Sequence, residues 1–318
     1  MFWVSHHKLI GYKYRGASPL VRWFRLEMNV LHIPISRSIG YITFMLCCMV
    51  AACSPISYRA AVAEHAVVGL EDTQTSIEEK LSANIVTYEE LIGLASKAGQ
   101  AEIIVFPEFG LNPIDNQNRK QLSVVAEAIP EVGTVPCFSS AGEIVKRMSC
   151  AAKEQKISVL VNMVDRVTNG GSEYLYNTNV IFDENGVLVS KYYKNHEWYP
   201  LLRAYDQISS PDNATYTPTW GPTFGIFTCF DIMWPTPAVK TYIDEMGISH
   251  FLFPVQQGLW GDKTIIPHWS KQNSATLLSA NLGSRVSGIF KDGKELPHET
   301  LYLREGCEEN IKVAEVFI

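Results

Sequence analysis

Three side chains of reactive types stand where short apolar segments end. They are Glu108 after residues 102–106, Lys194 after residues 187–193 and Cys229 at the end of residues 224–229. A thiol can attack the carbonyl carbon of an amide, a carboxylate can take and return the proton, and an ammonium can stabilise the oxyanion. Since α/β proteins build sites at the ends of strands, the three side chains are candidates for one hydrolytic site.

Each of these residues also has an ordinary interpretation when it is considered alone. Glu108 comes after Pro107, which ends strand pairing, and is either a partly desolvated general base or a solvated loop glutamate. Lys194 is either catalytic or a surface residue like its neighbour Lys191. Cys229 is either a buried structural cysteine or a nucleophile on a strand-to-helix turn that aims backbone N–H groups at an oxyanion.

Alternating strand and helix patterns surround the three candidates. Strands are predicted at residues 60–68, 102–106, 157–163, 179–182, 187–193, 224–229, 249–253, 276–281 and 311–317. The segment 183–186 ends in Asn-Gly between two apolar runs, which predicts a β-hairpin and hence a mixed sheet. A polar loop is expected from about residue 195 to residue 222. The alternation predicts the α/β class.

Helices are predicted from apolar residues that recur at steps of three and four. The first covers residues 77–95, with a capping box of Thr75 and Glu78 and an end near Gly99. The second is capped by Ser140 with Glu143 and continues through Ala152, and the third covers residues 238–246. Another helix begins near Ile265 and contains His268.

The first 57 residues differ from the rest. Four arginines and one acidic residue precede the apolar stretch 39–52, which ends in small residues and is typical of a secretory signal peptide. A membrane-spanning helix needs about 20 apolar residues, so the remaining alternative is a buried helix. Met28 as the start would give the signal an ordinary length. We therefore expect residues 58–318 to form the folded body, with membrane contact through the signal alone.

Charge and spacing exclude several classes of partner. The formal net charge is −6 and the body has no long Lys/Arg run, so nucleic acid is not an expected partner. The histidines lack metal-ligand spacing, and the hydrolytic chemistry requires neither a metal nor an organic cofactor. Asn213-Ala-Thr215 is an N-glycosylation sequon, which is weak support for secretion because such triplets are common.

In combination these motifs resemble the nitrilase (carbon–nitrogen hydrolase) superfamily, and within it the vanin and biotinidase branch. The residues that carry the resemblance are Phe-Pro-Glu108, Pro136-Cys137, Arg147-Met-Ser-Cys150, 174–182, 191–194, 225–232, Phe253-Pro254 and 277–281. The resemblance extends from about Tyr58 to the C-terminus. It implies a four-layer αββα sandwich with two mixed sheets inside and helices outside.

The resemblance also assigns roles to particular residues. Glu108 is implied as the general base, Lys194 as the electrostatic stabiliser and Cys229 as the nucleophile. Lys194 and the Phe230 N–H would hold the oxyanion, and a thioester acyl-enzyme would follow. Cys137 and Cys150 are expected to form a disulfide; the alternative is two unrelated small core residues.

The implied substrate is a small-molecule amide. The vanin branch hydrolyses pantetheine to pantothenate and cysteamine, and this is the expected reaction of a secreted enzyme. The alternatives are a biotinidase-like amidase and a catalytically weak secreted binding protein of the same fold. The segment 255–275 and the proline-rich 234–237 depart from the branch, and a C-terminal vanin-type domain is expected to be absent. A homodimer paired through a sheet edge remains an option.

Overall fold

The computed structural model describes residues 56–67, 69–256, 264–283, 286–306 and 308–318. The chain divides into two units, Met1–Ser54 and Pro55–Ile318, and the description below concerns the second alone. The predicted basic and signal segment, residues 1–57, lies outside the described residues except for Ile56 and Ser57.

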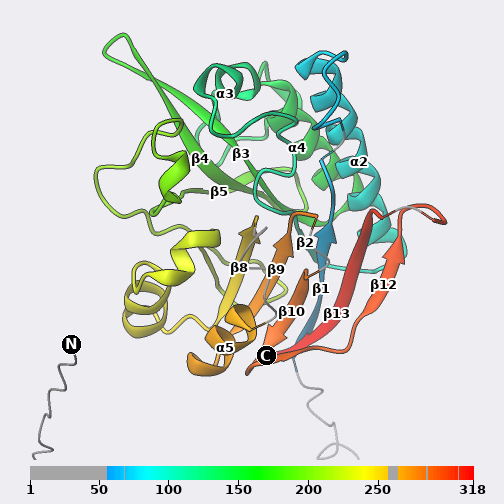
Figure 1. Ribbon diagram of the computed structural model, residues 1–318. Coiled ribbons are helices and arrows are strands. Elements are labelled where there is room, and N and C mark those ends of the chain that lie inside the picture. Colours follow the sequence, from blue (N-terminus) through cyan, green and yellow to red (C-terminus); the bar gives the residue numbers. More distant parts are fainter. Residues whose placement is uncertain (1–55, 68, 257–263, 284–285, 307) are drawn as a thin grey trace, which may run out of the picture. The chain divides into compact units, whose positions relative to one another are not determined.

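Two mixed β-sheets form the interior of the described unit (Figure 1). The seven-stranded sheet has the order β12 (Glu299–Tyr302), β13 (Asn310–Phe317), β1 (Ser57–Glu64), β2 (Ile103–Val105), β3 (Ser158–Asn169), β4 (Ser172–Phe182) and β5 (Leu188–Tyr193). The six-stranded sheet has the order β11 (Lys294–Glu295), β10 (Gly288–Lys291), β9 (Thr276–Asn281), β8 (His250–Val255), β7 (Phe224–Ile226) and β6 (Thr215–Tyr216). Strands β1–β2–β3 and β7–β8–β9 are parallel, and the pairs that flank them are antiparallel. The α/β prediction with mixed sheets is confirmed.

Helices cover the outer faces of both sheets. They are α2 (Ile77–Lys97), α3 (Arg119–Val125), α4 (Glu143–Gln155) and α5 (Ile265–Gln272), with the 3₁₀ helices η1 (Pro136–Phe138), η2 (Tyr199–Leu201) and η3 (Cys229–Met233) and the π-helix η4 (Ala238–Glu245). Helices α2 and α4 pack on the seven-stranded sheet, and η4 and α5 pack on the six-stranded one. The result is the αββα arrangement.

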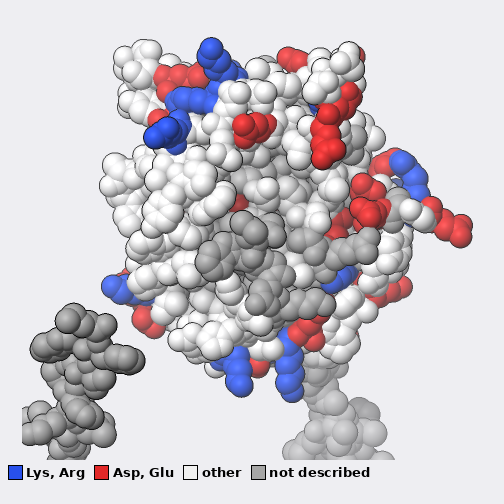
Figure 2. All heavy atoms as spheres, viewed as in Figure 1, with Lys and Arg blue, Asp and Glu red and all other residues white. Residues whose placement is uncertain are grey.

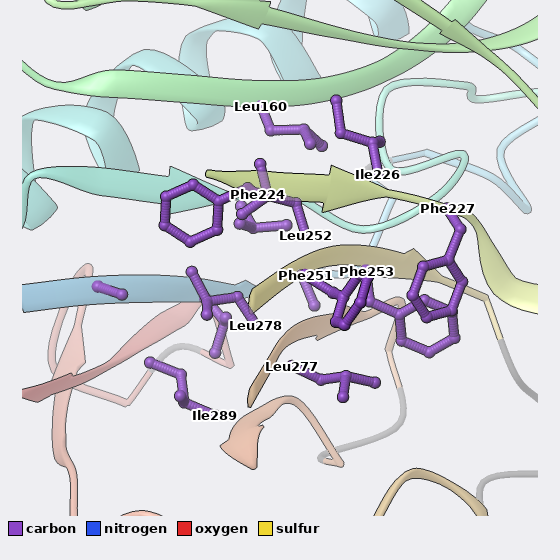
Figure 3. Close-up of a cluster of buried hydrophobic side chains, with 14 of the residues drawn as sticks. Leu160, Phe224, Ile226, Phe227, Phe251, Leu252, Phe253, Leu277, Leu278 and Ile289 are labelled. Carbon is purple, nitrogen blue, oxygen red and sulfur yellow. The ribbon is translucent and has the colours of Figure 1, made fainter. Parts of the chain in front are cut away.

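Neighbouring residues on the central strands enter two different cores. In β1, Ala60 and Val62 contact the other sheet, whereas Ala61 and Ala63 contact the helices. Because side chains alternate across a strand and both faces are covered, such strands are apolar throughout. Figure 3 shows the inter-sheet core, where Leu160 of β3 faces a row of large side chains from the six-stranded sheet.

The N-terminal caps of α2 and α4 both differ from the predicted ones, which were wrong. The capping box of α2 is Ser76 with Glu79, one residue later than predicted, because the buried face of the helix fixes where its first turn lies. The N-cap of α4 is Gly142, which has no side chain to donate or accept. The carboxylate of Glu127 occupies that space and accepts the N–H groups of the first helical turn, and a Cβ on Gly142 would lie 2.3 Å from it. A distant residue thus replaces the predicted local cap.

Several strands differ from the sequence prediction. Strand β1 ends at Glu64 rather than residue 68, and β6 lies inside the predicted polar loop. Strands β10, β11 and β12 were not predicted, because they are two to four residues long and partly exposed. Residues 257–263 of the divergent segment lie outside the described residues, while α5 begins at Ile265 as predicted.

Charged side chains of both signs lie around the edge of the face shown in Figure 2. None of the helices in the described part of the chain combines the length and apolarity that crossing a bilayer requires.

Cys137 of η1 and Cys150 of α4 are joined by a disulfide with a Cα–Cα distance of 4.8 Å. The bond closes a short loop, with a sequence separation of 13 residues, and so restricts the unfolded chain. We expect the double variant Cys137→Ser/Cys150→Ser to lose about 2–3 kcal/mol of unfolding free energy, measured by urea denaturation. An unchanged midpoint and slope relative to the wild type would contradict this expectation.

Candidate active site

Glu108 is a buried residue that lies just beyond the carboxyl end of β2. Its side chain is 1% exposed, so it is not the solvated loop glutamate of the alternative interpretation. Oε1 accepts hydrogen bonds from Lys194 Nζ at 2.7 Å and from Asn177 Nδ2 at 2.9 Å, and Oε2 accepts the Gln256 N–H at 3.3 Å. These donors hold the carboxylate in one orientation.

Lys194 reaches Glu108 because of the strand directions. Strand β5 is antiparallel to β4, which is antiparallel to β3, so β5 runs in the same direction as β2 and ends at the same edge. The Lys194 side chain is 1% exposed. Burial lowers its pKa, but the carboxylates of Glu108 and Glu197 outweigh this and raise the pKa well above its ordinary value. Lys194 is therefore a buried lysine whose charged form is favoured by its two carboxylate partners, and not a surface lysine.

Cys229 is a free thiol on the turn after β7. Its backbone φ is +46°, a left-handed conformation that a non-glycine residue seldom adopts. Such strain is typical of functional positions that the surrounding structure holds in place. The half-buried Cys229 is also the first residue of η3, so the Phe230 N–H lies in the first turn, where N–H groups have no partner inside the helix.

The surroundings of Cys229 favour the protonated thiol. Burial is the main cause that raises its pKa, and the Glu108 carboxylate adds to the effect, whereas Lys194 opposes it. The sulfur lies within hydrogen-bonding reach of Glu108 and donates to the Gln256 carbonyl at 3.5 Å. A thiol with a raised pKa needs a base to become a nucleophile, and Glu108 is a carboxylate within reach of this one.

Glu197 belongs to the same buried cluster and was not predicted. Its Oε2 lies 3.4 Å from Lys194 Nζ, and its side chain is 2% exposed. Burial raises the pKa of Glu197 to about 7, with Lys194 opposing and Glu108 adding to the rise. Protonation of Glu197 removes one negative charge from the buried cluster of Glu108, Lys194 and Glu197. Only its spacing of three residues from Lys194 signals this in the sequence.

Replacing Glu197 with Gln should change how stability depends on pH. Since the folded pKa of about 7 exceeds the ordinary 4.5, the folded protein keeps a proton that the unfolded chain releases. The stability from this group is full below about pH 4.5 and is lost as the pH rises through about 7. Glu197→Gln should therefore gain stability relative to the wild type from about pH 5 to about pH 8, in urea unfolding at a series of pH values. A difference that stays constant over this range would contradict the assignment.

Two further residues connect the parts of the site. The Asp231 carboxylate accepts the backbone N–H of His196 at 2.8 Å, the Tyr192 hydroxyl at 2.8 Å and the Thr228 N–H at 2.9 Å. It thereby ties the chain on both sides of Lys194 to the turn that carries Cys229. Gln256, after β8, contacts both Glu108 and Cys229 through its backbone. Backbone contacts of this kind leave no signal in the sequence.

Exposed aromatic rings lie against Phe230, the residue after Cys229. Tyr199 is 68% exposed and meets Phe230 edge-on at 5.8 Å, and Trp234 is 40% exposed and stacks on His196 at 4.8 Å. The remaining predicted positions lie elsewhere: the disulfide is on η1 and α4, and Asn213 is exposed in the loop before β6. Within the described ranges, no group of three or more His, Cys, Asp and Glu side chains is arranged to hold a metal ion.

Comparison with known proteins identifies the family of the chain. Residues 66–276 match the family model described as carbon-nitrogen hydrolase. The chain belongs to this family. An amidase from Nesterenkonia sp., another structure of which is described as from the nitrilase superfamily, has the same fold, with a TM-score of 0.58 and 17% identity over 82% of this chain and 90% of that chain. The predicted nitrilase-type fold is confirmed.

Curated relatives within the carbon–nitrogen hydrolase family carry the names of the predicted branch. The pantetheinase of Bos taurus is 33% identical over 292 residues, which cover 84% of this chain and 55% of that one. The vanin-like protein 2 of Drosophila melanogaster is 27% identical, and the biotinidase of Rattus norvegicus is 28% identical over 77% of this chain and 51% of that one. The chain spans about half the length of the curated relatives it matches.

Proposed function

We propose that this chain is an amidohydrolase that cleaves a linear amide through a Cys229 thioester. The observation that carries the proposal is the buried ion pair of Glu108 and Lys194, 2.7 Å apart and both 1% exposed, beside a thiol on a strained turn. Burying two charges has a large desolvation cost, which their mutual attraction offsets only in part. Here both charges face a reactive group.

The proposed reaction has two half-reactions. Glu108 takes the Cys229 proton as the sulfur attacks the amide carbon, and the resulting oxyanion is stabilised by the Lys194 ammonium and the Phe230 N–H. Glu108 then gives the proton to the leaving amine, and a thioester remains on Cys229. In the second half-reaction Glu108 takes a proton from water, the hydroxide displaces the Cys229 sulfur from the acyl carbon, the acid is released, and Glu108 returns the proton to the sulfur.

Pantetheine is the proposed substrate, because relatives named pantetheinase from five mammals are 30–33% identical over 83–86% of this chain. We expect the purified protein to release cysteamine from pantetheine, measured as amine and pantothenate in equal amounts. A protein that hydrolyses biocytin but not pantetheine would favour the biotinidase-like alternative, for which the rat relative is the supporting observation. A protein that hydrolyses neither, and whose Cys229 does not react with a thiol probe, would favour a binding protein.

Secretion is part of the proposal. The Cys137–Cys150 bond is of a kind that persists in oxidising compartments, and the exposed Asn213 could accept a glycan. The test is recovery of the chain from the medium of expressing cells with a glycan that the Asn213→Gln variant lacks. Retention of an unglycosylated chain inside the cells would contradict this part.

A further inference from the structure

Three buried asparagines form a hydrogen-bonded group between the two reactive turns. Asn162 lies on β3, and Asn177 and Asn179 lie on β4; their exposures are 1%, 3% and 1%. Asn162 pairs with Asn179 across the strands, so the three side chains project from the same face of the sheet. Leu160, two residues before Asn162, and its partner Ile181, two residues after Asn179, occupy the same face and pack in the inter-sheet core. The asparagines therefore continue an apolar row toward the site.

The group contacts the turn that carries the base. Asn162 Oδ1 accepts the Phe109 N–H at 2.9 Å, and Asn177 Nδ2 donates to Glu108 Oε1 at 2.9 Å. Phe109, the residue directly after Glu108, has a left-handed φ of +60°. A non-glycine residue in this region costs about 1–2 kcal/mol and persists only when its surroundings hold it.

The group also contacts the turn that carries the nucleophile. Asn179 Nδ2 donates to Thr228 Oγ1 at 2.6 Å, and Thr228 directly precedes Cys229 with its φ of +46°. The asparagines thus bond one strained residue, Phe109, directly and the residue before the other, Cys229, and these two turns follow strands of different sheets.

Asn162 sets the direction of every hydrogen bond in the group. Because its oxygen accepts the Phe109 N–H, its NH₂ group must face its neighbours, and it donates to Asn177 Oδ1 at 2.7 Å and Asn179 Oδ1 at 2.9 Å. Because those oxygens already accept hydrogen bonds from Asn162, the NH₂ groups of Asn177 and Asn179 face away from it, toward Glu108 and Thr228. A flipped Asn177 side chain would place its oxygen against the Glu108 carboxylate. No single amide of the group can therefore be flipped without losing hydrogen bonds.

We propose that Asn162 is a positioning residue that holds Glu108 and the Cys229 thiol in register through Asn177 and Asn179. The inference rests on the proposed function, since it assumes that Glu108 takes the Cys229 proton. A displacement of about 1 Å between reacting groups can lower a rate by 10²-fold. The simpler alternative is that three buried amides merely satisfy one another.

The test compares Asn162→Ala with Ser149→Ala. Ser149 on α4 is the control, because it is also 0% exposed and its hydroxyl bonds the Gly186 carbonyl at 2.6 Å and the Cys137 N–H at 3.0 Å rather than Phe109 or Thr228. The first readout is the rate at which iodoacetamide alkylates Cys229, which does not require pantetheine to be the substrate. The second is kcat and KM for pantetheine, at a temperature well below the melting midpoint of each variant.

We expect Asn162→Ala to lower kcat by about 100-fold with KM within about threefold of the wild type. Its alkylation rate should differ from that of the wild type by at least tenfold, whereas Ser149→Ala should lower the melting midpoint and leave both rates within about threefold. Equal losses of rate in the two variants, or wild-type alkylation in Asn162→Ala, would overturn the inference. A wild type that hydrolyses pantetheine and biocytin no faster than Glu108→Gln would contradict the proposed function itself, and with it the inference.

A second pair of variants decides the question if Asn162→Ala does not fold. Thr228→Val removes the hydroxyl that accepts from Asn179, and Thr228→Ser keeps it. We expect the serine variant to stay within about threefold of the wild-type kcat and the valine variant to lose at least tenfold, by the same misplacement of reacting groups. Equal activity in the two Thr228 variants would overturn the inference.

Discussion

Replacing Cys229 with alanine is expected to lower amide hydrolysis by about 10⁴-fold or more. Loss of the nucleophile from a group that acts as a unit removes the covalent route altogether, and only binding and oxyanion stabilisation remain. We expect Glu108 and Lys194 to keep their 2.7 Å pair, because the hydrogen bond joins them directly and does not include the sulfur. The measurement is kcat for pantetheine under saturating substrate.

The fold of the Cys229→Ala variant should be little changed. Cys229 is only half-buried, and alanine occupies the left-handed position at a cost similar to that of cysteine. Circular dichroism and the melting midpoint serve as the control for folding. A folded variant that keeps more than about 1% of wild-type kcat would show that another group attacks the amide, since nucleophile loss should cost far more.

Replacing Lys194 with methionine should damage both stability and activity. Methionine has a similar length, but it leaves the carboxylates of Glu108 and Glu197 buried without their cation. Removing one partner of a buried pair costs about 3–5 kcal/mol of unfolding free energy. Loss of an oxyanion-stabilising group should also lower kcat by about 10²–10³-fold. Urea unfolding and steady-state kinetics measure the two effects.

A double variant separates the two effects of Lys194→Met. Adding Glu197→Gln removes one of the two unpaired carboxylates, whose pKa is already raised to about 7 by burial. The double variant should recover part of the lost stability but none of the lost kcat, because the cation that faces the oxyanion is still missing. Recovery of kcat would assign Lys194 a structural role rather than a catalytic one.

That Glu108, Lys194 and Cys229 lie close together could be predicted from the sequence, because strand ends are visible in it. Glu108, Lys194 and Cys229 each close a run of apolar or β-branched residues, and parallel or doubly antiparallel strands end at the same edge of a sheet. The burial of both sheet faces also follows from strands that are apolar throughout. The resemblance to a family added the roles and the four layers.

The supporting residues could not be predicted, because strand register and distant segments decide them. Asn162 looks like any polar residue in a strand until its pairing with Asn179 is known. Gln256 acts through its backbone, which no residue type reveals. The cap of α4 comes from Glu127, fifteen or more positions before the amides that it accepts. Local patterns carry no information about such contacts.

The central claim, a thioester on Cys229, is tested most directly by capture with hydroxylamine. Pantetheine and a second amide of pantothenic acid with a different amine should give the same ratio of hydroxamate to free acid, because both pass through one acyl-enzyme. The Cys229→Ala variant should give neither product. A ratio that changes with the leaving amine, or acid released with no hydroxamate at any hydroxylamine concentration, would contradict the account.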